Sequence, residues 1–424
     1  MDFFVKRREK LGCLLKSGVV ILSNYCSDIK NRYTTTNIYN NYFFYLTGLT
    51  QYNSVFVLDI DANRTIFFGS DKEPQDELWS GSKPSPQEVA AKHGFDQAYD
   101  IAQLDHQLLK ILSPHRPIYW QLGSNPTLDH QLTEYTKRSY SQDTTHHQDL
   151  INILDKMRLI KDEEERRCLK KAGKISALAH QWAIKTIRPD QYEYQVESEL
   201  LYVFMQHGTK QTAYDSIVAA GKNACILHYS HNHAPIRKGE LLLIDAGCKW
   251  QGYASDITRT VPVNGRFSTI QKTVYDIVLA AQQAAIEQIK PQASCQAIAN
   301  AALNVLVQGM IDLKLLKGNI DNIIENKTYQ QFYMHGIGHW LGLDVHDVGE
   351  KFSQPELRLV PNMCLTVEPG LYIRPHPDIP AALHHIGIRI EDNVFVTETG
   401  CEVYTADDAP KSVQAIEELM RDSS

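Results

Sequence analysis

The sequence predicts a mixed α/β (α+β) protein with two domains. Three observations lead to this prediction: a length of 424 residues, a first part that alternates strand-like and helical runs, and a second part in which amphipathic helical stretches alternate with strands. A chain of this length exceeds the usual size of a single hydrophobic core, so two cores are expected. We expect an N-terminal domain at residues 1–150 and a C-terminal domain at residues 151–424.

The first 150 residues have the pattern of an α/β domain. A helix is expected at 101–112. Short apolar runs of β type predict strands at 18–23, 42–46, 54–60, 65–69 and 117–121. Between 125 and 148 the apolar density drops and Thr, His, Gln and Ser dominate, which is typical of a connecting segment. This places the domain boundary near Leu150.

Three helices are expected in the second part. Acidic residues at 162–165 favour a helix start through the helix dipole, and this helix should run over 162–186. Apolar residues recur at three- and four-residue steps over 270–289 and 296–313, which predicts two more helices. Strands are expected between and after them. No short-period repeat is present, which excludes solenoid and propeller architectures.

Composition and charge limit the expected partners. The apolar fraction of 43% and the charged fraction of 22% are close to globular averages, and no apolar run is long enough to span a bilayer. The formal charge of -7 is spread along the chain without a basic stripe, so neither nucleic acid nor a membrane is expected as a partner. Residues 1–15 lack a signal-peptide pattern, and the scattered cysteines form no C-x-x-C pair, which favours reduced thiols in the cytoplasm.

Two aspartates are expected to point at one place. A short apolar strand ends in Asp245, and a second strand at 253–263 carries Asp256, with a two-residue hairpin turn at 251–252 between them. If the residues that flank the turn pair with each other, Thr258 lies opposite Asp245. Asp256 is then a diagonal neighbour of Asp245 on the same face, at ~7 to 8 Å.

Glu368 and Glu391 also follow apolar β-like runs. Taken singly, each of the four acids is more often a turn residue, a strand end or a local hydrogen-bond acceptor. Together they would bury four negative charges at a heavy desolvation cost unless cations lie among them. The set of four therefore predicts bound metal ions.

The stretch 334–347 supplies an imidazole ligand. His335 and His339 are four residues apart and would share one face of a helix or a strand, but the glycines between them argue against a regular helix. The third glycine comes one residue late for a G-x-G-x-x-G phosphate loop, so a nucleotide site is rejected.

Four carboxylates and one histidine suit Mn²⁺, Co²⁺, Fe²⁺ or Zn²⁺ and do not choose among them. Two metals ~3.5 to 4 Å apart can hold a bridging hydroxide and polarise a scissile carbonyl, which is the chemistry of amide or ester hydrolysis. The rival hydrolytic motifs G-x-S-x-G and H-E-x-x-H are absent from the sequence, and so is a P-loop.

Five segments lead to a resemblance to a known family. They are Ile-Leu-His-Tyr at 226–229, Leu-Ile-Asp-Ala-Gly-Cys at 243–248, Ser-Asp-Ile-Thr-Arg-Thr at 255–260, the stretch 335–347, and Thr-Val-Glu-Pro-Gly-Leu-Tyr at 366–372. On these residues the chain resembles aminopeptidase P (Xaa-Pro aminopeptidase), in the creatinase/methionine aminopeptidase superfamily of pita-bread metallopeptidases. The resemblance covers residues 155–420, and more weakly the N-terminal part through 44–48 and 78–79.

The resemblance implies a creatinase-like N-terminal domain that serves oligomerisation or substrate access, followed by a pita-bread catalytic domain. It implies five metal ligands: Asp245 on one metal, His339 on the other, Asp256 and Glu391 bridging both, and Glu368 binding a metal while it shuttles a proton.

Further site residues are implied by the same resemblance, although a lone histidine is more often an ordinary core residue. His228 would steady the tetrahedral intermediate, with His346 on the other side of the substrate. Arg389 shares a strand face with Glu391 and is expected to pair with the metal-binding carboxylates. Substrate contacts are expected from His335, from Tyr372 and, from a neighbouring subunit, from Trp79.

We therefore expect an exopeptidase that releases the N-terminal residue from peptides with proline at the second position. Two divalent metals are expected, with Mn²⁺ favoured, in a homodimer or homotetramer. One alternative is an Xaa-Pro dipeptidase (prolidase), which shares the ligands; a more remote one is a non-enzymatic relative that keeps the fold for binding. Segments 29–41 and 375–385 depart from the family pattern. The resemblance therefore predicts neither the subunit contacts at 29–41 nor the access to the site at 375–385.

Overall fold

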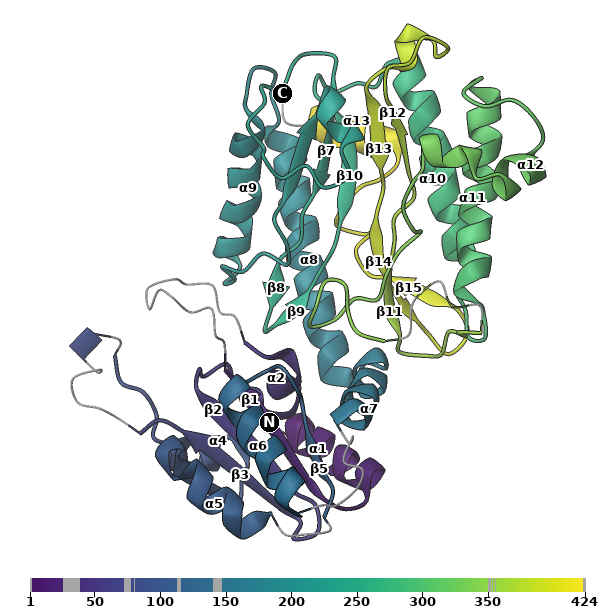
Figure 1. The fold of residues 1–424 in the computed structure, drawn as a ribbon. Helices are drawn as coiled ribbons and strands as arrows, with labels where there is room; N and C mark the ends of the chain where they lie inside the picture. The colour runs from purple at the N-terminus through teal and green to yellow at the C-terminus, as the bar shows by residue number, and fades with distance from the viewer. Residues whose placement is uncertain are drawn as a thin grey trace. The chain divides into compact units, whose positions relative to one another are not determined.

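The computed structural model describes residues 2–25, 39–71, 78–79, 81–112, 116–139, 147–349, 352, 354 and 356–421. The chain divides into two compact units, Met1–Met157 and Arg158–Ser424 (Figure 1). The division falls near the end of helix α7 (His147–Leu159), and the boundary predicted near Leu150 falls within the same helix. Among the described helices, none combines the length and apolar composition needed to cross a bilayer.

The first unit is built on a five-stranded mixed sheet. Its strands are, in spatial order, β4 (Gln97–Asp100), β3 (Arg64–Gly69), β2 (Ser54–Asp59), β1 (Val19–Asn24) and β5 (Ile118–Trp120). The two outer pairs are parallel and the two inner pairs antiparallel. The described helices of this unit include α1 (Asp2–Leu15), α2 (Asn41–Thr47), α4 (Pro86–His93), α5 (Leu104–Ile111) and α6 (Pro126–Ser139), and most of α7 also belongs to it.

Two predictions for this unit are wrong. Residues 42–46 were expected as a strand but lie in helix α2, because the Asn40 side chain caps the backbone N–H groups that open the helix and Gly48 closes it with φ 70°. The segment 125–148 was expected as a connector, yet 126–139 form helix α6. There Leu128 and Leu132, four residues apart, are buried in the apolar core of the sheet.

The three helices expected in the second unit are present. They are α8 (Glu163–Thr186), α10 (Thr269–Glu287) and α11 (Cys295–Asp312). Asp162 opens α8 with a capping box: its side chain accepts from the Glu165 backbone N–H, and the Glu165 side chain accepts in return. Helices α9 (Glu193–Gln206), α12 (Ile320–Glu325) and α13 (Val413–Arg421) were not expected.

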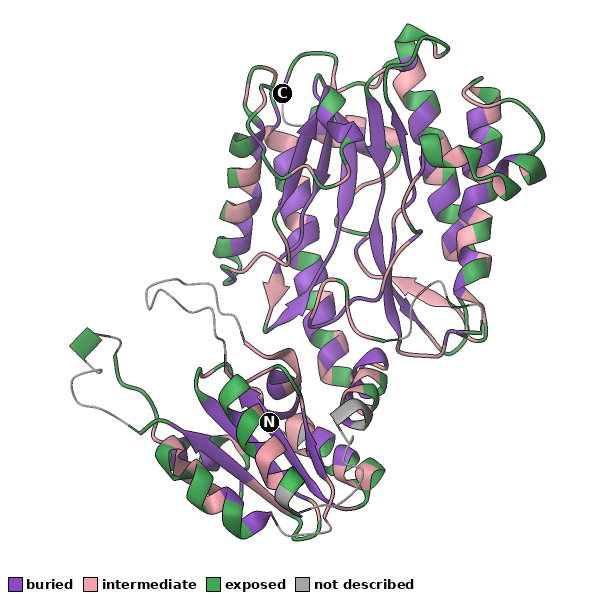
Figure 2. Ribbon diagram, viewed as in Figure 1, coloured by how far each residue is buried: buried purple, intermediate pink, exposed green. Residues whose placement is uncertain are grey.

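The strands of the second unit run between the α8–α9 pair and the α10–α11 pair (Figure 1). They are β6 (Ile217–Ala220), β7 (Leu241–Asp245), β8 (Lys249–Trp250), β9 (Tyr253–Ala254), β10 (Thr258–Pro262), β11 (Cys364–Val367), β12 (Gly370–Ile373), β13 (Ile386–Arg389), β14 (Asp392–Val396) and β15 (Cys401–Val403). All of them except β8 and β15 are buried along their whole length (Figure 2). An isolated bridge between Thr258 and Glu391 joins two of the sheets beside the strand ends that carry the acids.

Candidate metal centre and active site

The register expected for the two aspartates is confirmed. Trp250 pairs with Tyr253 across the turn, and Thr258 lies opposite Asp245 in the β7–β10 pair. The turn residues 251–252 both have positive φ, 49° and 87°, which suits a two-residue hairpin. The single strand expected at 253–263 is instead interrupted at 255–257.

Asp256 lies in this interruption, and Asn393 of β14 compensates for the ladder bonds that are missing there. The Asp256 backbone N–H donates to Asn393 Oδ1 over 3.0 Å, and Asn393 Nδ2 donates to the Asp256 carbonyl. The backbone N–H and carbonyl of Asp256 therefore keep hydrogen-bond partners although the strand is interrupted, and these partners fix Asp256 to strand β14.

The two aspartate side chains converge on a tyrosine that belongs to no motif. The Tyr214 hydroxyl lies 2.6 Å from Oδ1 of Asp245 and 2.6 Å from Oδ1 of Asp256. A phenol has one proton and can donate to only one of them at a time. The second short contact therefore leaves two carboxylates close together without a full complement of donors.

The two glutamates join this cluster from the neighbouring sheets. Glu391 follows β13, where its backbone N–H donates to the Thr258 carbonyl over 3.0 Å and its Oε2 accepts from the Thr258 hydroxyl over 2.7 Å. Glu368 lies between β11 and β12, where its Oε1 accepts from the Thr366 hydroxyl over 3.2 Å. All four acids are thus anchored beside strand ends, as their positions in the sequence predicted.

His339 completes the cluster from the glycine-containing stretch, which forms no regular helix or strand. Its Nε2 lies 3.4 Å from Asp256 Oδ2 and 3.5 Å from Glu368 Oε1. Its Nδ1 lies 2.9 Å from the Trp340 carbonyl, so Nδ1 holds the hydrogen and Nε2 offers its lone pair to a metal. One ligand atom each of Asp256, His339 and Glu391 lie within 4.8 Å of one another.

The pKa values of His339, Glu368 and Glu391 are all raised, because the clustered carboxylates favour bound protons. Burial, reinforced by the neighbouring carboxylates, raises the pKa of Glu368 to about 7 and that of Glu391 well above its usual range. Burial opposes protonation of His339, but Asp256 and Glu368 outweigh it and raise the His339 pKa to about 9. Protons thus do in the metal-free protein what cations would do, and the oxygen-rich donor set fits two divalent metals.

A chain of hydrogen bonds leads away from Asp245. Arg389 Nη2 donates to Asp245 Oδ2 over 2.5 Å, and Arg389 Nη1 donates to the Tyr372 hydroxyl over 3.0 Å. That hydroxyl lies 2.8 Å from His335 Nε2. The structure therefore brings four residues of the expected site together, Asp245, Arg389, Tyr372 and His335, and Arg389 pairs with a metal-ligand candidate as its strand position predicted.

His346 lies beside the cluster, with its ring centroid 4.2 Å from that of His339. The next residue, Asp347, is buried between two cations. Arg158 Nη2 and Lys161 Nζ each donate to Asp347 over 2.6 Å. Burial disfavours the Asp347 carboxylate, but these two cations hold its pKa below the usual range. His346 is thus attached to a firmly held point of the chain.

His228 lies in the segment after the short helical turn η2 (Gly221–Cys225) and is exposed. Its charge acts on two other expected histidines. Burial lowers the pKa of His335 to about 4 and lowers that of His346, and in both cases the charge of His228 adds to the effect. His228 is thus near enough to His335 and His346 for its charge to act on both.

Trp79 lies in the first unit with 83% of its surface exposed, and its expected role in the site stays a prediction. Of the atypical segment 29–41, residues 29–38 lie outside the described residues. In the other atypical segment, His385 has φ 65° and the His384 side chain contacts the Ile379 carbonyl.

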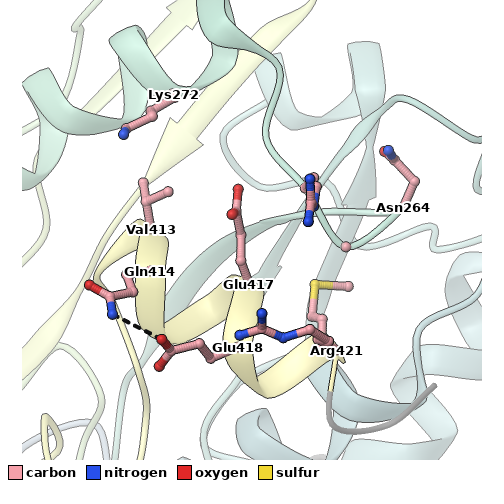
Figure 3. Close-up of a pocket in the computed structure, with 10 residues that line it drawn as sticks. Asn264, Lys272, Val413, Gln414, Glu417, Glu418 and Arg421 are labelled. Carbon is pink, nitrogen blue, oxygen red and sulfur yellow. Dashed lines mark hydrogen bonds between the residues drawn. The ribbon is translucent and has the colours of Figure 1, made fainter.

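A separate cavity of about 510 Å³ lies between helix α13, the turn at 264–266 and the start of α10 (Figure 3). Its lining is a mixture of acids and bases, and Gln414 donates to Glu418 there, an ordinary pair one helical turn apart. None of the expected site residues lines this cavity, and no metal-ligand geometry is found among its side chains.

Comparison with known proteins extends over both units. A model of metallopeptidase family M24 matches residues 167–398, and a model of the aminopeptidase P N-terminal domain matches residues 4–119. The Xaa-Pro aminopeptidase of Haemophilus influenzae is 39% identical over 98% of this chain and 96% of its own length. The Xaa-Pro aminopeptidase of Escherichia coli is 36% identical over 98% and 97%.

Solved structures are similar over the same extent. Aminopeptidase PepP of Pseudomonas aeruginosa has a TM-score of 0.92 and 39% identity, and the match covers 99% of this chain and 98% of that one. A zinc-substituted E. coli aminopeptidase P in complex with product has a TM-score of 0.92 and 34% identity, with 100% and 98% covered. The α/β architecture of two domains is thus shared along the whole length.

Proposed function

The chain belongs to metallopeptidase family M24, and from this premise we propose that it is an Xaa-Pro aminopeptidase, which hydrolyses the bond between an N-terminal residue and a following proline. The observation that supports this most directly is the cluster at the strand ends, where His339 Nε2 lies within 3.5 Å of both Asp256 and Glu368. Few other uses explain three buried carboxylates and one half-buried carboxylate around one correctly oriented imidazole.

Asp245, Asp256, His339, Glu368 and Glu391 would hold two divalent cations, which supply an activated water at neutral pH and polarise the scissile carbonyl. Glu368 accepts the proton of the attacking water. It then returns this proton to the proline nitrogen as the C–N bond breaks, so that a free amino acid and a peptide with N-terminal proline are released.

The histidines and Arg389 act on the substrate and on the ligands. His228 donates to the carbonyl oxygen as it gains negative charge, with His346 on the opposite side of the substrate. Arg389 holds the Asp245 carboxylate and, through Tyr372, the orientation of His335, which we assign with Tyr372 to the substrate pocket. A bond that precedes proline has no N–H, so the site must recognise the ring by its shape.

We infer that Mn²⁺ is the native metal: the donor set accommodates it, and the preference over Co²⁺, Fe²⁺ and Zn²⁺ rests on the resemblance to aminopeptidase P. Protein purified from cells grown with equal Mn²⁺, Co²⁺, Fe²⁺ and Zn²⁺ should contain mainly manganese by elemental analysis. A consistent excess of zinc or iron would reverse this assignment while leaving the hydrolytic one intact.

We also infer a homodimer or homotetramer in the cytoplasm. Trp79 and Leu78 are 83% and 88% exposed, which is unusual for large apolar side chains and suits residues that a second subunit covers. The seven cysteines of the described residues are free thiols, which suits a reducing compartment. Sedimentation analysis of the wild type and of Trp79→Ala should give the mass of a dimer or a tetramer of the 48.2 kDa chain. A monomer in both would contradict the assembly.

The proposed function is tested by removing and restoring the metals. Chelation should abolish hydrolysis of an Xaa-Pro tripeptide, and two equivalents of Mn²⁺ per chain should restore it. The Asp256→Asn variant should fail to recover, whereas the exposed Glu398→Gln should recover like the wild type. Full activity in metal-free protein, or recovery of Asp256→Asn, would refute the two-metal mechanism.

A further inference from the structure

The segment that carries His228 has no regular structure to hold it. Within the described residues, the backbone groups of 227–233 make no hydrogen bond to other backbone groups, and His228 itself is exposed. A side chain that must meet one oxygen of the substrate needs a defined position, because a displacement of about 1 Å can lower a rate by about 10²-fold. The position of His228 must therefore come from side-chain anchors.

Glu193, the first residue of helix α9, is such an anchor. It is fully buried. Each of its two carboxylate oxygens accepts two hydrogen bonds. Oε1 accepts from the Ala220 backbone N–H over 2.8 Å and from Asn223 Nδ2 over 2.9 Å. Oε2 accepts from the Tyr229 hydroxyl over 2.8 Å and from the Ala234 backbone N–H over 2.8 Å. The four donors come from before and after His228 in the sequence.

The donor next to His228 connects this anchor to the site. Tyr229 follows His228 directly, and its ring joins Leu227 and Met334 against an apolar cluster that contains Tyr372. The cluster holds the ring of Tyr229, and Glu193 holds its hydroxyl. Because the side chain is held at both points, the backbone at 228–229 is fixed as well. His228, the residue directly before Tyr229, is then held in place together with it.

We propose that Glu193 is a positioning residue for the hydrolytic reaction, which through four hydrogen bonds to the 220–234 segment holds His228 where the substrate carbonyl develops charge. This inference rests on the proposed function. A carboxylate is required because a glutamine has only one acceptor oxygen, so Glu193→Gln would turn an amide N–H₂ group against two of the four donors.

A second acid on the same helix provides a matched control. Glu197, one helical turn later, accepts only one hydrogen bond from the segment, from Asn232 Nδ2 over 2.9 Å. Glu197→Gln keeps an acceptor oxygen for this single donor, so it should leave the segment in place. Tyr229→Phe removes one of the four donors to Glu193 and should act in the same direction as Glu193→Gln but more weakly.

The experiment measures kcat and KM for an Xaa-Pro-Xaa tripeptide with the metal-loaded wild type, Glu193→Gln, Tyr229→Phe and Glu197→Gln, each also combined with His228→Ala. We expect kcat of Glu193→Gln to fall roughly tenfold to a hundredfold with little change in KM, with two metals still bound. In the His228→Ala background the same change should have little further effect, because Glu193 acts through His228.

The outcomes separate this inference from the proposed function. An inactive wild type would refute the proposed function and with it the inference. An active wild type with unchanged kcat in both Glu193→Gln and Tyr229→Phe would refute the inference alone. An equal loss in the presence and absence of His228 would also overturn it, since it would show that Glu193 only supports the fold. If Glu193→Gln does not fold, Tyr229→Phe decides.

Discussion

Metal removal should make the stability of the protein depend on pH in a way that the metal-loaded form does not show. In the metal-free cluster the pKa of Glu368 is raised from 4.5 to about 7, so stability falls as pH rises through this interval and buried glutamate becomes charged. The pKa of His339 is raised from 6.5 to about 9, so the stability it contributes is complete below 6.5 and is lost as pH rises through about 9. Both groups therefore make the metal-free protein less stable as pH rises.

The size of the effect follows from these values. A rise from 4.5 to about 7 corresponds to about 3 kcal/mol, and the rise from 6.5 to about 9 is of similar size. Glu368 and His339 shift each other through the same charges, so the two contributions overlap and we expect about 3 kcal/mol for the cluster rather than their sum. For a unit of this size this corresponds to roughly 5 to 10 °C in Tm.

The assay is thermal unfolding of the chelated and the Mn²⁺-loaded protein between pH 5.5 and 8.5. The Tm difference between the two forms should widen by several degrees from acid to alkaline pH. Asp347 and Asp392 have lowered pKa values, so the stability that they contribute to the protein is lost as pH falls. This contribution is the same in the chelated and the Mn²⁺-loaded protein, so it cancels in the Tm difference between them. Glu368→Gln should reduce the widening. A gap that stays constant or narrows with pH would refute this reasoning.

Three further variants test other parts of the structure. Asp256→Asn should abolish turnover while circular dichroism and Tm of the metal-free protein change little, with Glu398→Gln as the unaffected control; equal turnover would contradict its role as a ligand. Asp347→Asn should lower the free energy of unfolding by about 3–5 kcal/mol in denaturant titrations, because two buried cations lose a buried carboxylate that both of them contact; a change below about 1 kcal/mol would show that these ion pairs are screened. Gly338→Ala should weaken metal binding about 10-fold or more, since a Cβ there would lie 2.1 Å from a backbone oxygen of β11 and displace His339; unchanged affinity by metal titration would contradict this.

The convergence of Asp245 and Asp256 could be predicted because it depends on local rules. A two-residue turn at 251–252 fixes the register of the hairpin, and the register fixes which residues are diagonal neighbours. The family resemblance then assigned metal-ligand roles to three residues much farther along the chain, His339, Glu368 and Glu391. The local rules failed at 42–46, where aromatic residues suggested a strand but Asn40 and Gly48 cap a helix.

The residues that support the site could not be predicted, because their partners are distant in the sequence. Tyr214 reaches Asp245 and Asp256 across a gap of 31 and 42 residues, and Asn393 reaches Asp256 across 137. Neither residue follows an apolar run or belongs to a motif, so nothing in its neighbourhood marks it. Glu193 was also missed, since a glutamate at a helix start is ordinarily explained by the helix dipole.

Release of an N-terminal residue before proline is the activity proposed for this protein, and the most direct test compares three substrates. The Mn²⁺-loaded protein is incubated with an Xaa-Pro-Xaa tripeptide, the matching Xaa-Pro dipeptide and an Xaa-Ala-Xaa control, and release of the first residue is followed. We predict rapid release from the tripeptide and little from the other two. Preference for the dipeptide would make the protein a prolidase, and no release from any of the three would contradict the assignment of an Xaa-Pro peptidase.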